Sequence, residues 1–178
     1  MSTPRAPKPA KLVIGIIMKD KGLIGPLADE LAGRFGPVDI ISRWFSFDYT
    51  SYYEAEMGSP LFRRMLAFKT LIEQQELSRI KNITNDIELK YSANGKRAVN
   101  LDPGYMLCER FVLATGKNYT HRIYIGNNIY ADLTLIYQEG GFKKLPWTYP
   151  DYSNESMLSF LKNIRDKYID DLRRKEEK

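Results

Sequence analysis

The chain has 178 residues, of which 43% are hydrophobic, and a formal net charge of +5 at neutral pH. This length suffices for one well-buried core and is short for two, so we expect a single domain. The one cysteine, Cys108, cannot form an intramolecular disulfide, and no apolar run approaches the roughly 18 residues of a membrane span. Because the first residues also lack the apolar stretch of a secretory signal, a cytoplasmic protein is expected.

Composition also indicates where the domain ends. Three prolines and little apolar surface mark residues 1–10 as a disordered arm. Residues 11–172 are expected to form the single α+β domain, and residues 173–178 a frayed charged tail. The twelve tyrosines offer flat apolar faces with hydroxyl groups, which suit ligand pockets and core edges equally well.

The N-terminal part predicts a strand, a helix and a second strand. Residues 12–18 are a continuous apolar run, typical of a central strand covered on both faces. Apolar residues then recur at helical spacing over 23–35, and the Gly-Pro pair at 36 and 37 ends that helix. Residues 38–48 are rich in β-branched and aromatic side chains and predict a strand that continues towards residue 54.

The middle of the chain predicts four more elements and a turn. An extended run covers 61–72, and its basic residues indicate an edge strand, where charge discourages unwanted strand addition. These residues are Arg63, Arg64 and Lys69. Residues 75–91 have the apolar stripe of a helix. Strands at 97–101 and 111–115 follow, and Asp102-Pro103-Gly104 between them is an ordinary turn sequence.

The next residues predict a hairpin whose register follows from its loop. With Gly126-Asn127-Asn128 as a three-residue loop, Ile125 faces Ile129 and Ile123 faces Ala131. A two-residue loop would mix apolar and polar faces. The three-residue loop is therefore expected.

This register creates one polar, aromatic face. Arg122 lies opposite Asp132, and Tyr124 lies opposite Tyr130. The same alternation puts the single histidine, His121, on the apolar face.

The order strand, helix, strand, strand, helix, strand predicts an α+β fold. Its core would be a ferredoxin-like split β-α-β unit, with an appended antiparallel hairpin and a C-terminal helix. A loop over 138–151 carries Trp147, and the last helix is expected from about Asn154.

Polar and aromatic side chains are denser between residues 100 and 152 than strands need for folding, so we expect one wall of a binding site there. If Asp132 orients the guanidinium of Arg122, that group becomes a fork for a phosphate or carboxylate. The pair can equally be a cross-strand ion pair worth about 0.2–1 kcal/mol. The candidate ligand-binding residues are Asn100, Asp102, Tyr105, Lys117, His121, Arg122, Tyr124, Tyr130, Asp132, Trp147 and Tyr149.

Three functions are compatible with these residues. The leading hypothesis is binding of a small anionic ligand such as a nucleotide, with Trp147 and Tyr149 closing over it. A second is divalent-metal-dependent phosphoester hydrolysis through Asp102, Asp132 and Glu88, although one histidine on an apolar face is a poor basis for a metal site. A third is RNA binding on the sheet. No motif assigns a cofactor or a catalytic residue.

Several longer motifs are similar to one known family. Residues 100–105, 121–124 and 146–152 resemble the bacterial family catalogued as domain of unknown function 4416, and the resemblance extends from Lys8 to about Tyr168. It implies no particular activity. Asp132 stands where the family pattern has a glutamate, which keeps the charge and shortens its reach.

Overall fold

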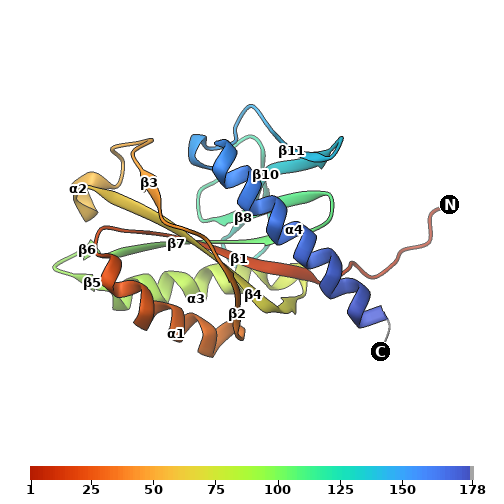
Figure 1. The fold of residues 1–178 in the computed structure, drawn as a ribbon, viewed down its shortest axis with the longest axis horizontal. Helices are drawn as coiled ribbons and strands as arrows, with labels where there is room; N and C mark the ends of the chain where they lie inside the picture. Colours follow the sequence, from red (N-terminus) through yellow and green to blue (C-terminus); the bar gives the residue numbers. More distant parts are fainter. Residues whose placement is uncertain (177–178) are drawn as a thin grey trace.

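The computed structural model describes residues 1–176 and shows a mixed α/β architecture built on one large antiparallel sheet (Figure 1). The strands of this sheet are β1 (Ala10–Met18), β2 (Val38–Ile41), β3 (Phe45–Phe47), β4 (Leu61–Ile72), β7 (Val99–Met106), β8 (Arg110–Thr115), β9 (Arg122–Tyr124), β10 (Tyr130–Gln138) and β11 (Gly141–Lys144). A separate small hairpin pairs β5 (Ser92–Ala93) with β6 (Lys96–Arg97). The helices are α1 (Ile24–Phe35), α2 (Glu54–Met57), α3 (Leu77–Lys90) and α4 (Glu155–Glu176), with short 3-10 turns η1 (Lys21–Leu23), η2 (Gln74–Glu76) and η3 (Pro150–Tyr152).

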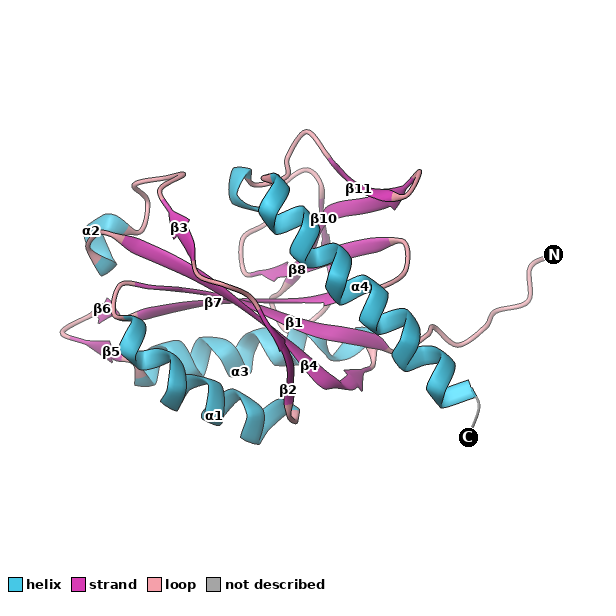
Figure 2. Cartoon of the chain, viewed as in Figure 1, coloured by secondary structure: helices cyan, strands magenta, loops and turns pink. Residues whose placement is uncertain are grey.

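The sheet is organised around β1. The strand order is β11-β10-β8-β7-β1-β4-β2, and β1 pairs antiparallel with both β4 and β7. Gly15 lies at the middle of this arrangement, opposite Met65 of β4 and Asp102 of β7. Segments far apart in sequence are therefore neighbours in the sheet (Figure 2).

Helices cover both faces of the sheet (Figures 1 and 2). All nine residues of β1 are buried, which confirms the prediction of a central strand. Successive side chains of a strand point to opposite faces, so Leu12, Ile14 and Ile16 pack with α1 and α3. Val13 packs on the other face, in the cluster that contains Leu161 of α4.

The predicted helices are confirmed, with small changes at their ends. Helix α1 ends at Gly36, whose φ of 90° favours glycine, and its N–H donates to the carbonyl of Ala32. Helix α4 begins one residue after Asn154, whose side chain accepts the N–H of Met157 at 2.9 Å and caps the first turn. The helix continues through Glu176, and residues 177–178 of the predicted tail lie outside the described residues.

The prediction that residues 61–72 form an edge strand is wrong. Strand β4 pairs with β1 on one side and with β2 and β3 on the other. Arg63 is 3% exposed, so its charge does not protect an edge. It is instead directed into the site described below.

The predicted strand over 38–48 is broken into β2 and β3. Between them the Ser42 hydroxyl accepts the N–H of Met65 at 2.9 Å, while the Ser42 N–H donates to the Met65 carbonyl. A side chain thus replaces part of the strand ladder and bends the chain. The segment towards residue 54 leads into the short helix α2 and not into more strand.

The prediction of a turn at Asp102-Pro103-Gly104 is also wrong. These residues continue β7 and pair with Gly15, Ile14 and Val13 of β1. A Cβ at Gly104 would lie 2.4 Å from the Val112 carbonyl oxygen, so glycine is needed for the close approach of β8 and not for a turn.

The predicted hairpin register is confirmed. Tyr130 pairs with Tyr124, and Asp132 pairs with Arg122. Asn128 has a φ of 61°, and Ile125 donates to the Ile129 carbonyl at 2.9 Å. The expected loop over 138–151, in contrast, contains a strand, β11, which pairs with β10.

The last residues of the predicted N-terminal arm are already in contact with the domain. Ala10 already belongs to β1. The carbonyl of Pro9 accepts a hydrogen bond from the Tyr168 hydroxyl at 2.7 Å, and that of Lys8 accepts one from Gln74 Nε2 at 2.9 Å.

Within residues 1–176 no helix combines the length and apolarity that a membrane crossing requires.

Candidate functional site

A cavity of about 670 Å³ lies where β7 and β8 diverge. The backbone pairing of these strands begins at Met106 and Phe111 and ends at Gly104 and Leu113. Beyond that point, residues 114–117 follow one wall of the cavity while Asn100 and Asp102 follow another.

Pro103 explains why the pairing of β7 with β8 stops there. Residues 101, 103 and 105 direct their backbone groups to the same side of β7, away from β1, because the direction alternates along a strand. Tyr105 pairs with β8, whereas Pro103 has no N–H to donate. The pairing therefore ends, and a gap opens beside Leu101.

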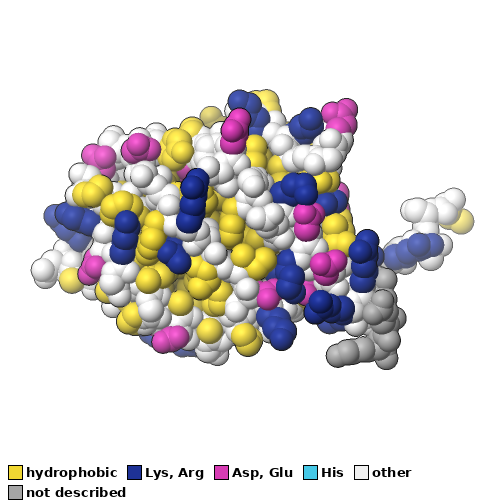
Figure 3. All heavy atoms as spheres, in the orientation of Figure 1, with side chains coloured by type: hydrophobic (Ala, Val, Ile, Leu, Met, Phe, Trp, Pro, Cys, Tyr) yellow, Lys and Arg dark blue, Asp and Glu magenta, His cyan; other side chains and the backbone are white. Residues whose placement is uncertain are grey.

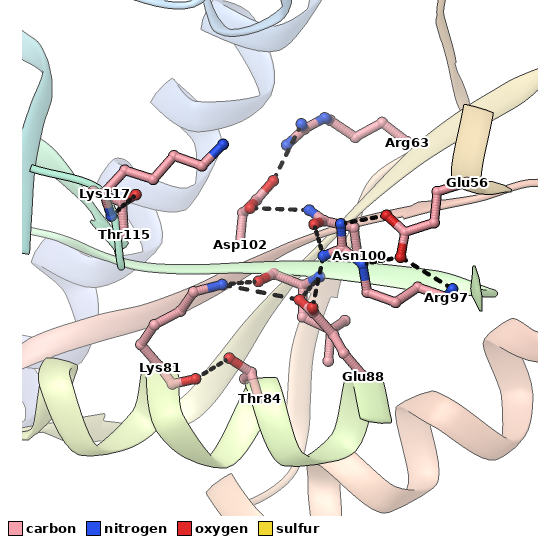
Figure 4. Close-up of polar contacts among 11 residues, drawn as sticks. Glu56, Arg63, Lys81, Thr84, Glu88, Arg97, Asn100, Asp102, Thr115 and Lys117 are labelled. Atoms are coloured by element: carbon pink, nitrogen blue, oxygen red, sulfur yellow. Dashed lines mark hydrogen bonds and ion pairs between the residues drawn. The ribbon is translucent and has the colours of Figure 1, made fainter. Parts of the chain in front are cut away.

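Two side chains of α3 occupy this gap and satisfy the backbone of β7 (Figure 4). Glu88 accepts the Leu101 N–H at 2.6 Å, and Lys81 Nζ donates to the Leu101 carbonyl at 2.7 Å. Burial raises the pKa of Glu88, although Lys81 and Arg97 oppose the change. Both side chains also line the cavity.

A chain of polar contacts extends from Glu88 along β7 (Figure 4). Arg97 holds Glu56 through two contacts of 2.7 Å and donates to Glu88 at 2.9 Å. It also donates to Asn100 at 3.0 Å, and Asn100 donates in turn to Asp102 at 3.0 Å. These bonds fix the orientation of Asp102, whose side chain is 24% exposed.

Arg63 is the buried cation of the site. Its guanidinium lies 2.8 Å from Asp151, 3.4 Å from Asp102 and 2.7 Å from the Tyr152 hydroxyl. Gly15 makes room for it, since a Cβ there would lie 2.7 Å from Arg63 Nη1. Burial raises the pKa of Asp151, although Arg63 opposes this.

Aromatic side chains also line the cavity. They are Phe47, Tyr49, Tyr52, Tyr53, Tyr149 and Tyr152. Burial raises the pKa of Tyr53, and the negative charge of Asp102 adds to this effect. Tyr53 therefore keeps its hydroxyl proton. Lys117 Nζ donates to the Tyr52 hydroxyl at 2.9 Å and lies 4.5 Å from the centre of its ring, and this hydrogen bond lowers the pKa of Tyr52.

The structure brings five of the eleven predicted residues to the cavity. These are Asn100, Asp102, Lys117, Asp132 and Tyr149. The other six do not line it.

Arg122 does not line the cavity but contacts residues that do. It pairs with Asp132 at 2.9 Å, donates to the Lys117 carbonyl at 2.9 Å and donates to the Tyr149 hydroxyl. All three of its nitrogens thus have partners within the protein. Its arrangement is that of a group that positions three lining residues.

His121 and Trp147 stack on each other beside Arg122. Their ring centres are 4.7 Å apart with an interplanar angle of 12°. His121 contacts Asp132 at 3.0 Å, so its expected orientation towards the apolar face is wrong. It precedes β9, and the strand alternation does not extend to it. Trp147 donates to the Leu133 carbonyl at 2.8 Å, which anchors it to β10.

The remaining three predicted residues have other surroundings. Tyr105 is 9% exposed and belongs to an apolar cluster. Tyr124 and Tyr130 make an edge-to-face pair with centres 5.4 Å apart on the outside of the hairpin.

Sequence reasoning missed several lining residues, among them Arg63, Tyr52, Tyr53, Lys81, Arg97 and Asp151. One signal was available for Arg63, because it alternates with the apolar Met65 and Ala67 and so shares their face. The other residues lie on helices, on loops or, for Arg97, on the two-residue strand β6, where no period places them in a common site.

The carboxylates of the proposed metal site are already engaged. Asp132 accepts from Arg122, His121 and Thr134, and Glu88 accepts from Leu101 and Arg97. Among residues 1–176 no three His, Cys, Asp or Glu side chains are grouped to hold a metal ion.

These features define a mixed α/β protein with a large antiparallel sheet and a polar, aromatic cavity beside its central strands. A family model described as Domain of unknown function (DUF4416) matches residues 8–168, and the chain belongs to this family. Neither a curated protein nor a solved structure matches the chain.

Proposed function

We propose that this protein binds a small anionic ligand with a flat ring, such as a nucleotide, in the cavity beside β7. The size of the cavity supports this proposal, because small-molecule sites commonly measure about 300–1,000 Å³. Its volume of about 670 Å³ falls within that range.

The observation that carries the proposal is that exposed aromatic rings and hydrogen-bonding groups line the same cavity. Tyrosine rings line it, and Tyr49, Tyr52 and Tyr149 are each more than 40% exposed. Asn85, Asn100 and Asp102 line it as well. Tyrosines offer stacking surface to a ring, and the carboxylate and amides offer hydrogen bonds to its polar edge and to hydroxyl groups.

Thermal-shift and calorimetric titrations with the four common ribonucleoside monophosphates test this function. We expect at least one to bind, and Tyr149→Leu to weaken it about tenfold or more through loss of stacking. Tyr119→Leu is the matched control, because Tyr119 is 64% exposed and does not line the cavity. Absence of binding by every nucleotide, or an equal loss in both variants, would reject the proposal.

The two alternatives gain no support from particular contacts. Phosphoester hydrolysis through Asp102, Asp132 and Glu88 would need carboxylate oxygens that Arg122, Arg97 and the β7 backbone already engage. RNA binding on the sheet would need an open sheet face, and helices cover both (Figure 2). On the face seen in Figure 3, basic side chains are spread among acidic and apolar ones.

We also propose that β1, α1, β2, β4, α3 and β7 form a ferredoxin-like split β-α-β core. The antiparallel order β7-β1-β4-β2 supports this, as does the position of α1 and α3 together on one face of the sheet. An experimental structure in which β1 does not separate β4 from β7 would contradict it.

A further inference from the structure

The cationic side chains that line the cavity are almost all neutralised within the protein. Arg63 contacts Asp102 and Asp151. Arg97 contacts Glu56 and Glu88.

Lys81 lies 3.9 Å from Glu88 and donates to the carbonyl of Leu101, so its charge is also opposed. Groups held in this way are poorly placed to neutralise a ligand, because each new contact would weaken an existing ion pair.

Lys117 is the exception. Of the lining cations in the described chain, it is the one with no carboxylate contact, and Nζ meets the hydroxyl and ring of Tyr52. Its backbone is fixed, since its N–H donates to Thr115 and its carbonyl accepts from Arg122. The side chain is exposed at the rim of the cavity, and Figure 4 shows it extended towards Asp102 and Arg63.

The interior of the cavity has the opposite character. The partly exposed carboxylate of Asp102 lines it. The side chain of Asn85 lines the cavity and has no hydrogen-bond partner in the part of the chain that the structure describes. Both groups favour hydroxyl, amine or amide donors of a ligand, and the carboxylate repels a second anionic group.

We propose, resting on the function proposed above, that the ligand carries one anionic group, a monophosphate held by Lys117 at the rim. The ring and hydroxyl groups point inward to Asp102 and Asn85. The lining has four cationic and four carboxylate side chains, and three of the four cations contact carboxylates, so among the described residues Lys117 alone is free for a phosphate and no second free cation is present for a polyphosphate. The site therefore selects a nucleoside monophosphate over the corresponding nucleoside and triphosphate.

Calorimetry with one nucleoside, its 5′-monophosphate and its 5′-triphosphate, each with and without Mg²⁺, tests this inference. The base is the one that binds best among the four monophosphates. We expect the monophosphate to bind about ten- to a hundredfold more tightly than the nucleoside, as one charged hydrogen bond provides. We expect the triphosphate to bind more weakly than the monophosphate under both conditions.

In the variant Lys117→Met the monophosphate should bind no more tightly than the nucleoside binds to the same variant. Lys143→Met is the control, since Lys143 is 49% exposed on β11 and does not line the cavity. Tighter binding of the triphosphate, or an unchanged preference for the monophosphate in Lys117→Met, would overturn the inference while leaving nucleotide binding intact. Failure of all three ligands to bind the wild-type protein would reject the proposed function itself.

Discussion

Replacing Arg63 by methionine tests the physical basis of the site without knowledge of the ligand. The substitution keeps an unbranched chain of similar length and removes the guanidinium. Asp151, whose side chain is 7% exposed, then loses its cationic partner, and Asp102 loses a more distant one. The Tyr152 hydroxyl also loses its donor.

The size of the effect follows from the burial of these groups. Removing one partner of a buried ion pair destabilises a protein by about 3–5 kcal/mol, because the other charge remains without compensation. Asp102 is 24% exposed and water can solvate it, so the lower end, about 3 kcal/mol, is expected. For a domain of this size, that corresponds to a fall in melting temperature of roughly 6–12 °C.

Urea denaturation and thermal unfolding measure this loss, and a double variant identifies its cause. Arg63→Met with Asp151→Asn should recover a large part of the stability, since it removes the uncompensated charge. Arg64→Met is the control, because Arg64 is next on the same strand and stacks over Trp44 at 4.8 Å. Its removal should cost about 0.5–1 kcal/mol. Equal losses in the two single variants, or no recovery in the double variant, would refute the ion-pair argument.

Three further predictions concern stability. Gly15→Ala should destabilise the fold by about 1–3 kcal/mol in urea titrations, because its Cβ would lie 2.7 Å from Arg63 Nη1, and an unchanged midpoint would contradict this. Lys81→Met should cost about 1–3 kcal/mol and speed amide exchange in β7, whose carbonyl it satisfies; unaltered exchange would argue against that role. Burial alone would raise the pKa of Asp171, but Lys11 and Lys167 lower it, so its stabilising effect is complete above the unfolded pKa of about 3.8 and is lost as pH falls through the lowered value. Asp171→Asn should therefore be destabilised at pH 7, and the difference from wild type should vanish in acid melts; a constant difference would show that its charge is not responsible.

The local sequence patterns were reliable where short-range contacts decide the structure. The hairpin register followed from the side-chain alternation of Ile123 and Ile125 and from asparagines that accept a positive φ at the loop. Helix α1 was recognised from its apolar spacing and the glycine that ends it. In both cases the residues that determine the conformation lie within about one turn or one strand pair of each other.

The local sequence patterns gave wrong predictions where pairing with a distant strand overrides the local conformational preference. Asp102-Pro103-Gly104 is a turn sequence by local preference, but the neighbouring strand β1 extends it into β7. The missing N–H of Pro103 then ends the pairing with β8 instead of turning the chain. The basic residues of β4 were misinterpreted for the same reason, since a sequence does not state which strands flank another.

The sequence by itself determined the central strand β1, the helices α1, α3 and α4, the hairpin pairing of Arg122 with Asp132, and the family. The tertiary structure alone decided which polar groups share a cavity. Arg63 and Tyr152 are 89 positions apart, and they meet because β4 lies beside β1 and η3 lies over the glycine between them. A side chain's periodicity gives only the face on which it lies, whereas its partners depend on the order in which the whole sheet assembles.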